Sequence, residues 1–160
     1  MTGIVVLALA VVVAVGFGLY RRTTDGAFRG AEDSVVEVRS EASLEAAAPA
    51  TTWTQVAAAL PDAVLGERAT LVQFSSAFCA PCRTTRVLLA DVSAREDGVV
   101  HLEVDAEQHL DLVRALDVRR TPTTLILDPN GAEVTRAAGA PRRDQVLAAL
   151  SSLDNLKETA

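Results

Sequence analysis

The pattern of apolar and polar positions divides the chain into three parts, and the first part is the most apolar. From Thr2 to Tyr20 no side chain is charged, and nearly every residue is aliphatic. At about 1.5 Å of rise per residue, a helix over this run would span roughly 28 Å, close to the hydrocarbon thickness of a bilayer. Residues 2–20 are therefore predicted to form one transmembrane helix that contacts the lipid bilayer.

The flanks of this run favour a stable anchor over a cleavable signal. No Lys or Arg precedes the run, and no convincing cleavage site follows it. Basic residues stay preferentially on the cytoplasmic side of a membrane. The C-terminal flank carries four of them, Arg21, Arg22, Arg29 and Arg39. We therefore expect a single-pass protein of the cell membrane whose C-terminal domain is cytoplasmic.

The second and third parts are a tether and a domain. Residues 21–52 are acidic and rich in alanine, with one short apolar patch at Val35–Val38 that is compatible with an isolated strand. Residues 53–156 show alternating strand and helix signals. Strands are expected at 69–74, 99–104, 123–127 and 132–136, and helices at 81–95, 106–116 and 142–153. This order predicts an α/β fold, with a small mixed sheet and helices on its faces.

Each predicted helix has an apolar stripe that is expected to face the sheet. The inward side chains would be Val87, Leu88 and Val92 in the first helix, Leu110, Val113 and Leu116 in the second, and Val146, Leu147, Leu150 and Leu153 in the third.

The composition of the chain excludes several classes of protein. With 160 residues, of which 49% are apolar, the chain can form one ordinary domain with a real core. Its formal net charge of −6 argues against nucleic-acid binding, which needs clustered Lys and Arg. The two cysteines are too few for a disulfide-stapled secreted fold.

The candidate chemistry lies in those cysteines. Cys79 and Cys82 enclose Ala80 and Pro81 where the first predicted strand ends and its helix begins. The exposed N–H groups at a helix start stabilise a thiolate, and proline suits the first turn because its missing N–H has no partner to lose there. We therefore expect Cys79 to be the nucleophile and Cys82 the resolving thiol in thiol–disulfide exchange.

The pair allows two other interpretations. A structural zinc ion takes four ligands, and the only other candidates are His101, in a strand signal, and His109, on a helix. The pair could also be redox-silent in a core, although a proline between the cysteines is unusual there. We expect no metal site.

The motifs FSSAFCAPCRTTRVLL, VVHLEVDAE and VRRTPTTLILDPNGAEV resemble the thioredoxin family, from about Ala69 to Leu153. The resemblance implies a thioredoxin-like fold, no bound cofactor, and redox positions at Cys79 and Cys82. It also implies that Pro122 is a cis-proline and that the backbone of Thr121 pairs with substrate; the sequence leaves open a trans proline that opens a strand. The substrate-binding residues would be Phe78, where the family usually has tryptophan, Ala80, Pro81, Thr121 and Pro122.

Two departures from the family pattern concern the reaction. Ala80-Pro81 replaces the usual Gly-Pro, which leaves the redox potential undetermined. Gln73 stands where the family commonly has a buried acid that assists proton transfer to the second cysteine, and a neutral amide cannot act as a base. Something else, such as bound water, has to deprotonate Cys82, or the second step is slower.

Other polar residues are assigned lesser roles. His101 is a hypothetical partner in proton handling, although a surface histidine on a strand is the favoured interpretation. His109 is expected to be a solvated helix residue. Four acidic residues are expected to form exposed faces, Glu103, Asp105, Glu107 and Asp111.

These features predict a membrane-tethered protein-disulfide reductase. It would exchange two electrons with membrane-associated protein disulfides and be reduced by an upstream thiol reductant or reductase. The alternative is a thioredoxin-like binding module whose cysteines bind or deliver a soft metal such as Cu(I), although Met1 is the only methionine that could add a ligand.

Overall fold

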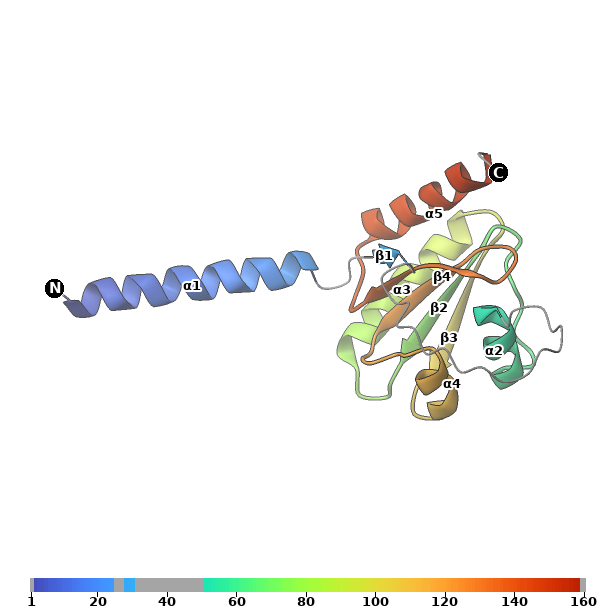
Figure 1. Cartoon of the computed structure of the whole chain (residues 1–160), viewed down its shortest axis with the longest axis horizontal. Helices are drawn as coiled ribbons and strands as arrows, with labels where there is room; N and C mark the ends of the chain where they lie inside the picture. Colours follow the sequence, from blue (N-terminus) through green and yellow to red (C-terminus); the bar gives the residue numbers. More distant parts are fainter. Residues whose placement is uncertain (1, 25–27, 31–50, 159–160) are drawn as a thin grey trace, which may run out of the picture.

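The computed structural model describes residues 2–24, 28–30 and 51–158 (Figure 1). Its helices are α1 (Thr2–Thr24), α2 (Thr52–Ala59), α3 (Ala80–Arg95), α4 (Leu110–Ala115) and α5 (Arg143–Glu158). Its strands are β1 (Phe28–Gly30), β2 (Ala69–Ser75), β3 (Val99–Asp105), β4 (Thr123–Leu127) and β5 (Glu133–Ala138). The apolar patch Val35–Val38 lies outside the described residues.

The strands form one mixed sheet in the order β1-β5-β4-β2-β3. Strands β2 and β3 are parallel, and the chain passes between them through α3. The pairs β2–β4, β4–β5 and β5–β1 are antiparallel. The predicted α/β class with a mixed sheet is therefore confirmed, and β1 adds an edge strand from within the segment expected to be a tether.

Alternating side chains of the central strands point to opposite faces of the sheet and build two cores. On one face, Val72 and Phe74 of β2 pack with α2 and α4. On the other face, Ala69 and Leu71 pack with α3 and α5, which lie on the opposite side from α2 and α4 in Figure 1. Because β2 and β4 are covered on both sides, all their side chains are buried.

Two helical stripes differ from the prediction. In α3 the buried residues are Cys82, Thr85, Leu89 and Val92, whereas Val87 is 70% exposed. The stripe that begins at Cys82 recurs every three or four residues and does not include position 87. In α4 the helix begins only at Leu110, which is 51% exposed, and the buried positions are Leu112 and Leu116.

The late start of α4 has a local cause. The Asp105 carboxylate accepts hydrogen bonds from the backbone N–H of Glu107 and from the side chain of Gln108, at 2.8 and 2.9 Å. An aspartate that bonds two residues ahead favours a turn over a helix. The first residues of the predicted helix, 106–109, therefore form a turn, and His109 lies at the N-cap of α4.

Helix α2, which the sequence analysis did not predict, is fixed to the turn between β4 and β5. Thr51 caps it, and the N–H of Trp53 donates to the carbonyl of Gly131 at 3.0 Å. Gly131 has φ +80°, and a Cβ atom there would lie 2.3 Å from Cβ of Trp53. The turn therefore needs glycine both for its backbone conformation and for this close approach.

Helix α1 covers the predicted anchor and continues to Thr24. Its large apolar side chains that the structure describes are all exposed: Val5, Val6, Leu7, Leu9, Val11, Val12, Val13, Val15 and Phe17. Within the described ranges, no helix is found that is long and apolar enough to cross a membrane. The transmembrane anchor at residues 2–20 therefore stays a prediction.

Candidate active site

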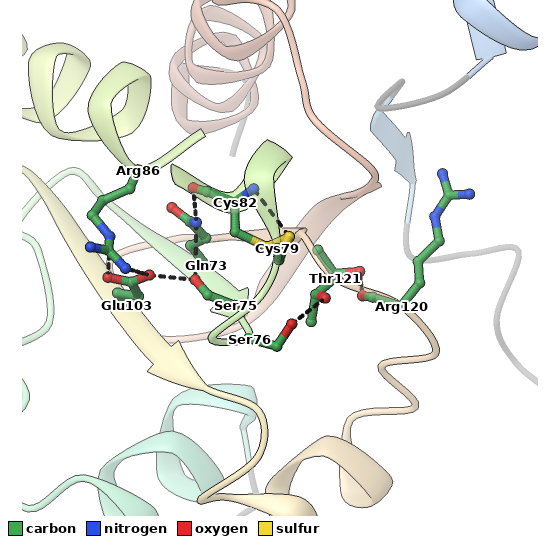
Figure 2. The surroundings of a disulfide bond; sticks show 10 residues. Gln73, Ser75, Ser76, Cys79, Cys82, Arg86, Glu103, Arg120 and Thr121 are labelled. Carbon is green, nitrogen blue, oxygen red and sulfur yellow. Dashed lines mark hydrogen bonds and ion pairs between the residues drawn. A yellow bond between two sulfur atoms is a disulfide. The ribbon is translucent and has the colours of Figure 1, made fainter. Parts of the chain in front are cut away.

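The two cysteines form a disulfide bond at the start of α3, just beyond the carboxyl end of β2 (Figure 2). Their Cα atoms are 5.2 Å apart. Cys79 is the N-cap residue, and its Sγ accepts a hydrogen bond from the backbone N–H of Cys82 at 3.1 Å. A thiolate on Cys79 would gain the same donor and the positive end of the helix dipole.

The two sulfur-bearing residues differ in access. Cys82 is 1% exposed, whereas Cys79 is only half-buried and adjoins the exposed residues Ala80 and Pro81. Phe78 precedes them with 97% of its surface exposed. An incoming sulfur atom can therefore reach Cys79, whereas Cys82 reacts from inside the protein.

The segment before β4 lies opposite Cys79, because β4 runs antiparallel to β2 and begins where β2 ends. The Thr121–Pro122 peptide bond is cis, as the resemblance implies. The hydroxyl groups of Ser76 and Thr121 are 3.1 Å apart, and the N–H of Gly139 donates to the carbonyl of Pro122 at 2.8 Å. Four of the predicted site residues thus meet at this end of the sheet: Cys79 and Cys82 at the start of α3, and Thr121 and Pro122 in the segment before β4.

A groove of about 520 Å³ runs along these loops. Its lining residues are Pro81, Arg120, Thr121, Pro122, Gly139, Ala140 and Arg142. Three of the five residues expected to bind substrate therefore line one groove, whereas Phe78 projects into solvent from the loop before α3.

Beneath the disulfide lies a buried polar residue, Gln73, which is fully inaccessible to solvent. Its Nε2 donates to the carbonyl of Cys82 at 2.9 Å and to Oγ of Ser75 at 3.1 Å. Its Oε1 is 3.2 Å from Nε2 of His101. The amide that stands in place of the family acid therefore links β2, where Gln73 lies, to the start of α3 and to His101 of β3.

His101 is half-buried, which corrects the expectation of a surface histidine. Burial lowers its pKa below the ordinary value of 6.5, and Arg86 acts in the same direction, while Glu103 opposes both. The lowered pKa favours the neutral imidazole, and Oε1 of Gln73 can only accept, so the contact fits the tautomer with its hydrogen on Nε2. His101 thus belongs to the buried cluster beside the disulfide.

Glu103 corrects a second expectation, because its side chain is only 27% exposed. It forms an ion pair with Arg86, with 2.6 Å between Nε and Oε2 and 2.7 Å between Nη2 and Oε1. The Ser75 hydroxyl also donates to its Oε1. Of the other three acidic residues, Glu107 and Asp111 are exposed as expected, whereas Asp105 is half-buried like Glu103.

A second cavity, of about 420 Å³, connects this carboxylate with the disulfide. It is lined by Ser75, Ser76, Ala77, Cys82, Arg83, Arg86, Glu103 and Asp105. Sequence reasoning missed this cluster, although strand pairing carries a signal. Gln73 pairs with Glu103, and Ser75 with Asp105, in the parallel register of β2 and β3, so these residues point to the same face.

Over the residues that the structure describes, no group of three or more His, Cys, Asp or Glu side chains could hold a metal ion.

Comparisons with known proteins point to one family. A family model described as thioredoxin matches residues 51–152. Thioredoxin H5 of rice (Oryza sativa subsp. japonica) is 32% identical over 46% of this chain and 54% of its own length. The mitochondrial thioredoxin of Bos taurus is 34% identical over 56% of this chain and 54% of its own length. The chain thus spans about half the length of these relatives.

Solved structures share the fold. A mutant thioredoxin from Halobacterium salinarum NRC-1 aligns with a TM-score of 0.50 and 21% identity, covering 54% of this chain and 75% of that chain. Thioredoxin F from spinach chloroplast aligns with a TM-score of 0.50 and 23% identity, covering 56% of this chain and 79% of that chain. At these identities the likeness concerns the fold alone.

Proposed function

Because this chain belongs to the thioredoxin family, we propose that it is a thiol–disulfide oxidoreductase acting on disulfide bonds of other proteins. The observation that carries the proposal is the unequal access of two bonded cysteines at a helix start. Cys79 caps α3 and is open to a partner, while Cys82 is buried behind it. In a pair placed in this way, Cys79 can form a mixed disulfide with a partner protein, and Cys82 can then displace the partner's sulfur atom.

The reduction of a substrate disulfide would take two steps. The Cys79 thiolate attacks one substrate sulfur, a mixed disulfide forms, and the other substrate sulfur leaves as a thiolate. Cys82 then loses its proton and attacks Sγ of Cys79, which forms the internal disulfide and expels the second substrate thiolate. Two electrons pass from the dithiol to the substrate, and solvent protonates the released thiolates.

The groove beside Pro122 is the proposed binding place for an extended substrate segment. It begins beside Pro81, next to the disulfide, and continues along Thr121 to Gly139. The backbone of Thr121 would supply hydrogen bonds to the segment, as in strand addition to a sheet edge. Phe78 would add an apolar contact because almost all of its surface is available.

We further propose that α1 tethers the domain to a membrane and that the domain is cytoplasmic. The run without charge from residue 2 to 20 and the exposure of its apolar side chains support the tether. The arginines that follow the run support the orientation. A tether would restrict the domain to partners at the membrane and raise their effective concentration. In the cytoplasm the dithiol would act as a reductant that an upstream thiol reductase keeps reduced.

The activity is tested with the full chain in mild detergent and a protein disulfide substrate such as insulin. Cys79→Ser should abolish reduction, because the first attack is lost. Cys82→Ser should instead accumulate a one-to-one mixed disulfide through Cys79, visible by mass and released by dithiothreitol. If the unmodified chain reduces no disulfide but binds Cu(I) stoichiometrically, the metal-binding alternative replaces this proposal.

The orientation is tested in intact cells with a membrane-impermeant thiol reagent. We expect labelling of Cys79 only after lysis. Labelling before lysis would place the domain outside the cytoplasm.

A further inference from the structure

The second step of the proposed reaction needs a proton acceptor for Cys82, and Gln73 cannot be that acceptor. An amide has no useful affinity for a proton at neutral pH. Its Nε2 is already engaged with the Cys82 carbonyl and Ser75, and its Oε1 with His101. Gln73 therefore has a structural role beneath the disulfide.

One carboxylate that shares a cavity with Cys82 is held from two sides, and it belongs to Glu103. Ser75, only 5% exposed, donates its hydroxyl hydrogen to Oε1, and Arg86 binds both carboxylate oxygens. In Figure 2, hydrogen bonds join Gln73 to Ser75 and Ser75 to Glu103 beside the start of α3. The carboxylate is thus fixed in place and joined to the Cys82 backbone through two neutral side chains.

The cavity joins Cys82 with this carboxylate. Cys82, Ser75 and Glu103 all line the same space of about 420 Å³. The space is polar and large enough for water molecules, which carry protons between groups that do not touch. Cys82 is otherwise closed to solvent, so the cavity is its route for proton exchange.

Two other titratable groups lie nearby and fit the role less well. Asp105 lines the cavity, but its carboxylate binds the turn that follows it, at the N–H of Glu107 and Nε2 of Gln108. Among the described residues, the hydrogen bond from the Ser75 hydroxyl goes to Glu103 and not to Asp105. His101 contacts Oε1 of Gln73 and is not among the described residues that line the cavity. Neither group is positioned as well as Glu103.

The groups that surround Glu103 come from three elements. Helix α3 contributes the cations Arg86 and Arg83, strand β3 contributes His101 and Asp105, and strand β2 contributes the neutral Ser75 and Gln73. The carboxylate thus pairs with one cation, Arg86, while a second cation, Arg83, and one further acid, Asp105, line the same cavity.

We propose that Glu103 accepts the proton of Cys82 in the second step and that Ser75 and Arg86 are positioning residues for it. This inference rests on the proposed function. The proton leaves Sγ of Cys82 as that sulfur attacks Sγ of Cys79, and it passes through water in the cavity to the carboxylate. The bond between Cys79 and the substrate breaks, the substrate leaves as a thiolate, and Glu103 later returns the proton to solvent.

The test separates the two thiol steps in a single turnover. The reduced full chain in mild detergent is mixed with one equivalent of a symmetrical nitrobenzoate disulfide. The first nitrobenzoate thiolate is released when Cys79 attacks, and the second is released when Cys82 closes the internal disulfide. We compare the unmodified chain with Glu103→Gln and with the matched control Asp105→Asn, which removes a charge from the same cavity.

We expect Glu103→Gln to slow the second release by about 100-fold at neutral pH and to leave the first within about twofold. Its second release should rise about tenfold per pH unit, as expected when solvent hydroxide removes the thiol proton. Asp105→Asn should leave both releases within about twofold. An unchanged second release in Glu103→Gln, or equal slowing in Asp105→Asn, would overturn the assignment.

Failure of the proposed function would look different, because the unmodified chain would then give no first release. If Glu103→Gln does not fold and loses both releases, the Glu103→Asp variant decides. Its carboxylate is one methylene shorter, so we expect a second release slowed by less than about tenfold, with the pH profile of the unmodified chain. A profile that rises tenfold per pH unit in this folded variant would contradict the inference.

Discussion

The substitution Gln73→Glu tests how strongly the buried site beneath the disulfide opposes an ionised side chain. Gln73 is fully buried, and the two side chains have nearly the same volume. A protonated carboxyl group can still donate one hydrogen bond to the Cys82 carbonyl, 2.9 Å away from the present Nε2. An ionised carboxylate there would repel that carbonyl oxygen and would have lost its water.

The size of the effect follows from the burial. Full burial raises a carboxyl pKa by up to about 3 to 5 units, and we take about 3 because Ser75 and His101 remain as hydrogen-bond partners. Each unit corresponds to about 1.4 kcal/mol, so the free energy of unfolding should fall by about 4 kcal/mol.

The pH window follows from the two ionisation midpoints. In the unfolded chain the introduced carboxyl ionises near its reference pKa of about 4.3, and in the folded protein near about 7. Between these values the unfolded state binds fewer protons than the folded state. Stability is therefore lost as the pH rises through this window.

The assay is urea unfolding of the full chain in mild detergent at several pH values from about 5 to 8. At each pH the free energy of unfolding of the variant is compared with that of the unmodified chain. Trp53 is the only tryptophan and packs against the core, so its fluorescence reports unfolding. Gln108→Glu, at an exposed position, is the matched control. Its carboxylate replaces a hydrogen bond to Asp105 with a repulsion in solvent, so we expect a loss below about 1 kcal/mol that stays constant across this pH range. A constant difference between Gln73→Glu and the unmodified chain across this range would refute the reasoning.

Three further substitutions, one of them a control, test by chemical unfolding how the helices are fixed to the sheet. The Arg68 side chain is 27% exposed, and its guanidinium lies 2.6 Å from the carboxylate of Asp154 in α5. The carboxylates of Asp154 and Glu96 raise its pKa. We expect Arg68→Ala to lower the free energy of unfolding by about 1–2 kcal/mol. Arg119→Ala, at an exposed pair, should cost less than about 0.5 kcal/mol, and equal losses would contradict the comparison. Gly131→Ala places a Cβ atom 2.3 Å from Trp53 at φ +80°, and should cost at least about 2 kcal/mol and shift the fluorescence of Trp53. A change below about 0.5 kcal/mol would show that this turn moves freely.

Much of the domain is readable from short segments. The strands at 69–74, 99–104 and 123–127 and the stripe of Val146, Leu150 and Leu153 were all found near their observed places. These features depend on residues a few positions apart, since strand alternation, helical spacing and caps are local properties. The same holds for the cysteines, because a strand end followed by Cys-Ala-Pro-Cys already places one sulfur at a helix N-cap.

Other features depended on contacts between distant segments. The inward direction of α3 could not be read from Val87, because which stripe is buried depends on the surface that the helix meets. Ser75 and Glu103 are 28 positions apart and touch only because β2 and β3 pair in one parallel register. A shift of that register by one residue would turn Glu103 to the opposite face, since side chains alternate along a strand. The position of the two cysteines can thus be predicted from a few neighbouring residues, whereas the position of the Glu103 carboxylate depends on how β2 and β3 pair in the sheet.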